Sequence, residues 1–475
     1  MATTNPIPFI GKPGQRSTGT TDSRFVNVLF EIDTDPVPGS FPVNCLKRPG
    51  LANHTQPSGG AAVGRGIHAW SANSNIYSVF DNKIWSDTTD LGVTLAGSTG
   101  RVWFMERHVD TGTRMLIVSD GADNYNIETN DTITQIDATD DAQYPASNLG
   151  PIVELDGYIF QALSNGQIWN TDINSAVAWT ATSFLTADTY GSDLEAIARQ
   201  KDQIIAFTKN RVEFYFNNGN PTGSPLLRID QNTLGFGIAH KNSLAFSGET
   251  LCFVSENAAN GDGGRSVFII QSLGKVKEIS TPHINRILAA EGTSISTCTA
   301  WMERVAGQLV YVLNLDSAER TFVYGVDTGL WSEWYNAAGD GKFPGVSATS
   351  LNGVVYVQDA ANGRVYTFPA TTYQDSGVTF SAIQQTGRSN HGSPARKFER
   401  ALSLVGDTVA ASVTVEVSDD DFSTFRTVGT IDMSKPLKRC TQLGSFYSRA
   451  HRFTHAANTA YRVQAWLPEL TNGNV

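Results

Sequence analysis

The chain carries a β-hairpin pattern that returns about every 45 residues. Each copy has an apolar β-branched or aromatic run, a tight turn rich in Asn, Asp or Gly, and a second run that ends in an aromatic residue. The clearest copies span residues 76–85, 158–169 and 354–366. One such unit cannot bury its own sheet, so neighbouring units must pack on each other. The pattern therefore predicts an all-β fold built as a β-propeller or a related radial array.

The spacing of the hairpins predicts about seven blades between residues 64 and 370, with six or eight as alternatives. The hairpin cores are anchored at Ile76, Leu116, Ile159, Ile204, Leu251, Leu309 and Val354. The longest interval, between the fifth and sixth anchors, contains a helix signal. Thr281 can cap that helix, Pro282 suits its first turn, and Gly292 is the expected stop.

The two ends of the chain differ from this middle part. Residues 1–63 are rich in proline and are expected to form an extended N-terminal arm, with one strand candidate at residues 25–30. Residues 371–475 are expected to form a separate antiparallel β-sandwich. Alternating apolar and polar positions occur there at residues 379–383, 402–405, 412–418, 427–431 and 460–467.

Composition narrows the class of protein further. Apolar residues make up 40% of the 475 residues and charged residues 17%, which suits a packed core. No apolar run is long enough for a transmembrane helix, and residues 1–16 lack the order of a signal peptide, so no export is expected. The net charge of −11 argues against a surface that grips nucleic acid through its phosphates. The widely separated Cys45, Cys252, Cys298 and Cys440 are expected to be buried free thiols in a reducing cytoplasm.

The run from Ser418 to Phe425 supports two interpretations. Asp419, Asp420 and Asp421 could together collect a hard cation such as calcium, although the run lacks the ligand spacing of a calcium loop. It also resembles the aspartate-box turn of sialidases, with Phe422 in place of a glycine. In that turn Asp420 accepts hydrogen bonds from backbone amides as a structural clip, and we favour this interpretation.

Three other motifs are each given a structural interpretation. His451 and His455 have a spacing that could bind zinc on a helix, but the flanking alternation favours a strand with surface histidines. The glycine-rich residues 59–66 lack the Lys-Ser/Thr pair of a phosphate loop and are expected to be a linker. Trp331 and Trp334 could stack on a sugar, but packing between blades is favoured.

No catalytic fingerprint is present. The sequence has no Gly-x-Ser-x-Gly motif, and its carboxylates and histidines are scattered. We therefore predict no catalytic, cofactor-binding or metal-binding residues and no enzymatic activity, while the residues that bind partners are not identified.

Several segments, in order, resemble the tail hub or nozzle proteins of short-tailed bacteriophages (podoviruses), also called packaged-DNA-stabilisation proteins. The early residues 45–51, Cys-Leu-Lys-Arg-Pro-Gly-Leu, resemble the part of that family where the arm enters the first blade. The similar segments further along are residues 193–197, 211–219, 225–230, 234–239, 276–284 and 329–334. The resemblance covers about residues 25–370, and a weaker similarity extends beyond residue 370.

This resemblance implies a structural virion protein of the phage tail, made in the host cytoplasm. It implies a homohexameric ring below the portal and adaptor proteins, with tail fibre or tail tip proteins as further partners. Genomic double-stranded DNA would pass through the ring without sequence-specific contacts, and an acidic lumen would repel its phosphates. No cofactor and no membrane are implied. The alternatives are a carbohydrate-active propeller, either a sialidase-like hydrolase or a glycan-binding tail protein, and a bacterial scaffolding propeller.

Overall fold

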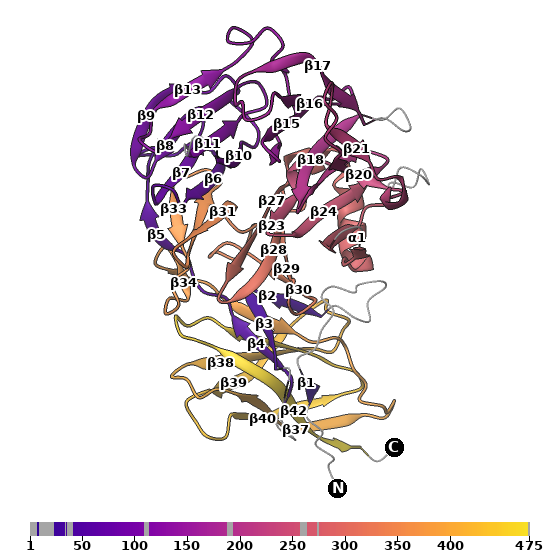
Figure 1. Ribbon diagram of the computed structural model, residues 1–475. Coiled ribbons are helices and arrows are strands. Elements are labelled where there is room, and N and C mark those ends of the chain that lie inside the picture. Colours follow the sequence, from indigo (N-terminus) through magenta and orange to yellow (C-terminus); the bar gives the residue numbers. More distant parts are fainter. Residues whose placement is uncertain are drawn as a thin grey trace.

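The protein is a β-propeller joined to a two-sheet β-sandwich (Figure 1). The computed structural model describes residues 7–8, 23–33, 35, 41–108, 114–187, 193–256, 264–272 and 275–473. Across these residues strands dominate, which confirms the predicted all-β class.

The first four blades are four-stranded antiparallel meanders. Their strands are β6 (Gly64–Trp70), β7 (Asn75–Phe80), β8 (Lys83–Ser86) and β9 (Thr89–Thr94); β10 (Trp103–His108), β11 (Arg114–Ser119), β12 (Asn124–Glu128) and β13 (Ile133–Ile136); β14 (Ile152–Leu155), β15 (Tyr158–Ala162), β16 (Gln167–Thr171) and β17 (Trp179–Thr186); and β18 (Leu194–Gln200), β19 (Gln203–Thr208), β20 (Val212–Asn217) and β21 (Leu226–Arg228).

Three more blades complete the propeller, which therefore has seven in the described part of the chain. Their strands are β22 (Gly237–Ile238), β23 (Ala245–Ser247), β24 (Thr250–Glu256), β25 (Val267–Ser272) and β26 (Lys275–Glu278); β27 (Thr299–Val305), β28 (Gln308–Leu315), β29 (Arg320–Gly325) and β30 (Leu330–Trp334); and β31 (Gly345–Leu351), β32 (Val354–Asp359), β33 (Val365–Thr367) and β5 (Ala52–Thr55). All seven anchors chosen from the sequence lie on β7, β11, β15, β19, β24, β28 and β32.

The ring is closed by a strand from the other end of the sequence. β5 pairs antiparallel with β33, so a segment that precedes the first blade becomes the outer strand of the last one. Beside it, the backbone N–H of Ala69 on β6 donates to Thr349 Oγ1 on β31, 2.9 Å away. The segment that leads into the first blade thus completes the last one, and the hydrogen bond from Ala69 to Thr349 joins the two blades.

The helix predicted between the fifth and sixth blades is present as α1 (Pro282–Ala290). Thr281 Oγ1 accepts from the backbone N–H of Ile284 at 3.4 Å and so caps the helix. Gly292 follows with φ of +53°, a left-handed conformation that glycine adopts without strain.

The sandwich has two facing sheets, and both ends of the chain contribute to each (Figure 1). The first sheet contains β3 (Val28–Ile32), β4 (Val43–Lys47), β42 (Arg462–Asn472), β37 (Lys397–Gly406) and β40 (Arg439–Phe446), with β1 (Ile7–Pro8) paired to β42. The second contains β2 (Arg24–Val26), β36 (Ala382–Gln385), β41 (Ala450–His455), β38 (Ser412–Ser418) and β39 (Arg426–Asp432). A small hairpin, β34 (Gln374–Asp375) and β35 (Val378–Thr379), leads into it.

The N-terminal region is therefore less irregular than its proline content suggests. The strand candidate at residues 25–30 corresponds to β2 and β3, whereas β4 and β5 were not expected. Phe25, Phe30 and Cys45 pack in the sandwich core with Phe453 and Trp466. The division into an arm (1–63), a propeller (64–370) and a sandwich (371–475) stays a prediction. In the structure, residues 24–47 complete the sandwich and residues 52–55 complete the propeller.

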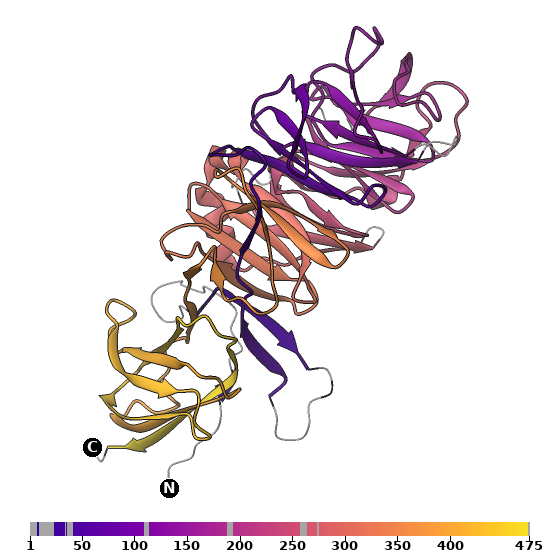
Figure 2. The ribbon, with the colours of Figure 1, turned by 90° about the vertical axis from the view of Figure 1, so that its left-hand side faces the viewer.

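One continuous sheet links the propeller to the sandwich. β2 pairs parallel with β30 of the sixth blade and antiparallel with β36, which makes a nine-stranded sheet. Figure 2 shows the sandwich, in yellow, at one end of the propeller, with the indigo β3–β4 hairpin beside it. Because backbone hydrogen bonds run across the boundary, we infer that the two parts move together.

Arg48 lies at the centre of this junction and is completely buried. Its guanidinium donates to both carboxylate oxygens of Asp375, at 2.6 and 3.0 Å, and to Asn27 Oδ1 at 3.1 Å. The same group lies over the ring of Phe380, 3.9 Å from its centroid.

A second close contact at the junction involves Gly50. A Cβ on Gly50 would lie 2.1 Å from the Gln374 carbonyl oxygen, so only glycine allows this close approach. The packing around Arg48 gives the segment at residues 45–51 a structural role.

Replacing Arg48 with methionine should destabilise the protein by about 3–5 kcal/mol, because Asp375 would remain buried without its partner. Chemical denaturation measures this change. The matched control is Arg304→Met, since Arg304 pairs with Asp327 at 3.5 Å on the exposed surface. That variant should lose less than about 1 kcal/mol. Equal losses for the two variants would contradict a special role for the buried pair.

Candidate functional site: the axial cavity of the propeller

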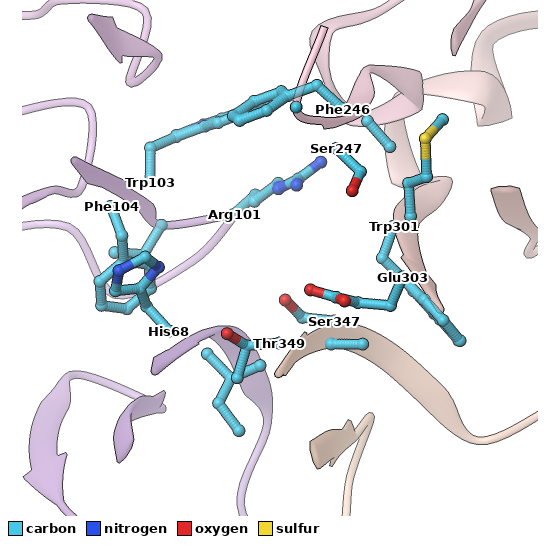
Figure 3. A pocket seen from close by; sticks show the side chains of 16 residues that line it. His68, Arg101, Trp103, Phe104, Phe246, Ser247, Trp301, Glu303, Ser347 and Thr349 are labelled. Carbon is cyan, nitrogen blue, oxygen red and sulfur yellow. The ribbon is translucent and has the colours of Figure 1, made fainter. Parts of the chain in front are cut away.

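A hollow lined by polar and aromatic side chains lies near the propeller axis. Strands β6, β23, β27 and β31, with the region around β10, surround a cavity of about 310 Å³ (Figure 3). The wall combines hydroxyl, guanidinium, carboxyl and aromatic groups. Its residues are Ile67, His68, Arg101, Val102, Trp103, Phe104, Ala245, Phe246, Ser247, Gly248, Trp301, Met302, Glu303, Ser347, Ala348 and Thr349. A concave, mostly pre-formed hollow with converging polar groups is typical of a small-molecule site.

Arg101 supplies the positive charge of the cavity. Its Nη1 donates to the carbonyl of Leu244 at 2.9 Å and to that of Asn242 at 3.5 Å. The guanidinium lies over the ring of Trp103, 4.1 Å from the centroid. Burial lowers the pKa of Arg101 to about 10, so the side chain is still cationic at neutral pH.

Glu303 on β27 supplies a carboxyl group to the opposite wall (Figure 3). Burial raises its pKa, while a hydrogen bond with Ser350 and the charge of His68 act in the other direction. His68 in turn lies 2.9 Å from Glu106 and stacks on Phe104 with 5.6 Å between ring centroids. The cavity therefore offers one cation, one carboxyl group with weakened acidity and an imidazole held in place by its neighbours.

A second hollow, of about 260 Å³, lies beside the first and shares Arg101 and Ser347 with it. Arg65 on β6 lines it and is buried. The Arg65 guanidinium donates to four carbonyl groups, those of Asp81, Gly97, Thr99 and Gly100. Arg101 and Ser347 thus stand between two small hollows, and side chains divide the space near the propeller axis.

The expectation that residues 59–66 form a linker is wrong at its end, because Gly64 and Gly66 belong to β6. A Cβ on Gly64 would lie 2.3 Å from the carbonyl oxygen of Asp359, and one on Gly66 would lie 2.8 Å from that of Val102. The glycines therefore allow the first blade to approach its two neighbours closely.

The turn at residues 418–425 has the hydrogen bonds of a structural clip. Asp420 Oδ1 accepts from the backbone N–H of Thr424 at 3.0 Å and from Ser418 Oγ at 2.8 Å. The neighbouring Asp419 pairs with Arg449, and Asp421 pairs with Arg388. The three carboxylates thus point to different partners. Among the described residues, no group of three or more His, Cys, Asp or Glu side chains is arranged to hold a metal ion.

His451 and His455 lie on strand β41, as expected, but the expectation that they are surface residues is wrong. Both are fully buried, because β41 is an interior strand and the two positions share its core-facing side. His451 Nε2 lies 3.0 Å from Glu399 Oε1. His455 stacks on Tyr461 with 4.5 Å between ring centroids. Strand geometry rather than helix geometry thus explains their spacing.

Glu399 links His451 to the aspartate turn. It is fully buried and accepts from Arg449 Nη1 at 2.9 Å, while Arg449 also donates to Asp419. Burial alone would raise the pKa of Glu399, but the charges and hydrogen bonds of His451 and Arg449 lower it. This network is internal to the sandwich and structural.

The tryptophans and cysteines behave as predicted. Trp331 Nε1 donates to the carbonyl of Ile279 at 2.7 Å, and Trp334 Nε1 donates to that of Val28 at 3.3 Å. Both indoles are buried and pack between blades or against the arm. Cys45, Cys252, Cys298 and Cys440 are free and buried. Within the described residues, no helix has the length and apolar character needed to cross a membrane.

Sequence reasoning did not find the cavity residues Arg101, Glu303 and His68. They lie on or beside three different strands, and none belongs to a recognisable motif. The available signal was polar side chains on the inner strands of predicted blades. That signal becomes informative only when the register of each blade is known.

The fold defines a seven-bladed β-propeller protein with a sandwich built from both chain ends. The chain belongs to the family of the bacteriophage P22 Gp10 β-propeller, whose sequence model matches residues 33–373. This confirms the resemblance seen in the sequence and identifies a phage structural protein. No curated protein matches the sequence.

Solved structures of propeller proteins are similar at low identity. A streptogramin B lyase is 14% identical, with 67% of this chain and 95% of that chain covered and a TM-score of 0.41. The virginiamycin B lyase of Staphylococcus aureus is 12% identical, with 67% and 98% covered and a TM-score of 0.43. BamB of Moraxella catarrhalis is 11% identical, with 74% and 98% covered and a TM-score of 0.37. No functional conclusion follows from these similarities.

Two histidines of the sandwich, the half-buried His391 and the fully buried His455, predict acid sensitivity of this part of the protein. Burial is the main cause that lowers the pKa of His391 and that of His455 from an ordinary 6.5 to about 4. The nearby charge of His451 also lowers the pKa of His391, and the charge of Lys47 also lowers the pKa of His455. Between these pH values the unfolded chain binds more protons than the folded one, so stability is full above pH 6.5 and falls toward pH 4.

Thermal unfolding followed across this pH range tests the effect. The double variant His391→Gln/His455→Gln should show a shallower fall in melting temperature than the unchanged protein, and the exposed His54→Gln should keep the original slope. A melting temperature that does not change between pH 6.5 and 4 would show that these histidines do not couple folding to protons.

Proposed function

We propose that the chain is the tail hub, or nozzle, protein of a short-tailed bacteriophage. Six copies form a ring below the portal and adaptor proteins, retain the packaged DNA and conduct it during ejection. Membership of the phage P22 Gp10 β-propeller family supports a structural role in the phage particle. The ring, its place in the virion and its tail fibre or tail tip partners are part of this proposal.

The observation that carries the proposal is the narrow interior of the propeller. The two hollows near its axis measure about 310 and 260 Å³, and Arg101 and Ser347 stand between them. A B-DNA duplex is wider than its own major groove, which alone measures about 12 Å across. A duplex therefore cannot enter either hollow. A route for DNA must therefore lie between several copies of the chain. A closed ring is the simplest assembly that provides such a route.

Two further features suit a building block of such a ring. The nine-stranded sheet and the buried contacts of Arg48 join propeller and sandwich into one stiff unit. The net charge of −11 per copy suits an assembled lumen that repels phosphates rather than binds them. DNA then passes without sequence-specific contacts, and the proposed role requires neither a cofactor nor enzymatic activity.

Native mass spectrometry of the purified chain, alone and mixed with the portal–adaptor complex of its phage, tests the assembly. We expect a six-copy species in at least the mixture, and we expect the chain in purified virions by peptide mass spectrometry. A chain that stays monomeric in both samples and is absent from virions would contradict the proposal.

The interaction with DNA gives an independent check. At physiological salt we expect the purified chain to leave the electrophoretic mobility of double-stranded DNA unchanged, because the net charge of the chain is negative. Electrophoretic mobility measurements at low and physiological salt reveal this. Tight binding that weakens steeply with salt would indicate a cationic DNA-gripping surface instead.

A further inference from the structure

We propose that the axial cavity binds one acidic monosaccharide, whose carboxylate pairs with Arg101 while its hydroxylated ring lies between Phe246 and Glu303. This inference does not depend on the ring assembly. Failure of either proposal leaves the other unaffected, because the cavity is formed within one chain.

The first argument is the orientation of Arg101. Among the described residues, both hydrogen bonds of its side chain start from Nη1 and run to the carbonyls of Asn242 and Leu244. Figure 3 shows the guanidinium pointing into the cavity beside Trp103. The rest of its planar donor edge is therefore placed to receive a carboxylate, the anion that matches a guanidinium in shape.

The second argument is the set of polar groups that face Arg101. Figure 3 shows the Ser247 hydroxyl, the Ser347 hydroxyl and the Glu303 carboxyl around the same space. Burial raises the pKa of Glu303, so its carboxyl is less acidic than an exposed one, and its oxygens can accept hydrogen bonds from ligand hydroxyls. Hydroxyl and carboxyl groups at several points of one wall suit a ligand that carries several hydroxyls.

The third argument is the apolar wall and the size of the cavity. Phe246 is 48% exposed although it lies on the short strand β23 at the cavity. Phe104 forms part of the opposite side (Figure 3). The apolar face of a pyranose ring can cover such aromatic surface. A volume of about 310 Å³ lies at the lower limit of small-molecule sites and suits a ligand of about one sugar unit.

Other ligand classes fit less well. A doubly charged phosphate would meet a single guanidinium with the Glu303 carboxyl nearby, so its second charge would be uncompensated. A purely apolar ligand would bury the remaining donors of the Arg101 guanidinium and the cavity hydroxyls without a ligand partner, and each such group costs free energy. An acidic sugar combines the one negative charge, the hydroxyls and the apolar ring face that the wall requires.

Isothermal titration calorimetry and saturation-transfer NMR on the full chain test the proposal with three probes. Glucuronic acid carries the ring and the carboxylate, glucose only the ring, and acetate only the carboxylate. We expect glucuronic acid to bind at least about tenfold more tightly than either partial probe, as expected for a charge-assisted hydrogen bond. No binding of glucuronic acid at millimolar concentration, or equal binding of glucose, would overturn the proposal.

Variants locate the binding. Arg101→Met should lower the affinity for glucuronic acid by about tenfold or more. The matched control Arg114→Met, at an exposed position of β11, should leave this affinity unchanged. Circular dichroism shows whether each variant is folded. If Arg101→Met does not fold, Phe246→Ala decides, because it removes a half-exposed side chain and should still weaken binding severalfold. Unchanged binding in a folded Arg101→Met or in Phe246→Ala would place the ligand elsewhere and overturn the proposal.

Discussion

The buried contact between Arg48 and Asp375 is the interaction on which the rest of the architecture depends. It joins the segment that leaves the sandwich, the hairpin that leads back into it, and the loop that follows the sixth blade. Burying an ion pair gives little net stability, because both charges lose their water. Its main effect here is on the geometry of the junction. If these three segments were arranged differently, Arg48 and Asp375 would separate and a buried charge would lose its partner. The position of the sandwich relative to the propeller is thereby fixed.

The same junction closes the propeller. Directly after Arg48 the chain passes the tightly packed Gly50 and forms β5, which completes the seventh blade before the first blade begins. The arm and the last blade are thus held in place by contacts between residues that are more than 300 positions apart, such as Arg48 and Asp375. A propeller closed in this way resists opening at its seam.

Much of the fold could be predicted from local patterns, and the reason is visible in particular elements. Each blade carries its own hairpin signal, so the anchors Ile76, Leu251 and Val354 each lie on a strand of a separate blade. β5 gave no such signal, because its partner β33 comes from a distant segment. β4 pairs with the nearby β3, but residues 33–42 separate the two strands, which is longer than the tight turn that the hairpin pattern requires. His451 and His455 were misplaced for a related reason. Their burial depends on β41 being an interior strand, and the sequence around them does not show that.

The candidate site was beyond local reasoning altogether. Arg101, Ser247 and Glu303 come from three blades and meet only because the propeller curves them toward one axis. This same curvature narrows the axis and excludes a duplex, which links the cavity to the proposed assembly. An electron microscopy map of the phage tail with DNA in transit tests this account most directly. It should show the duplex on a ring axis, outside every propeller, whereas duplex density along the axis of a single propeller would contradict the account.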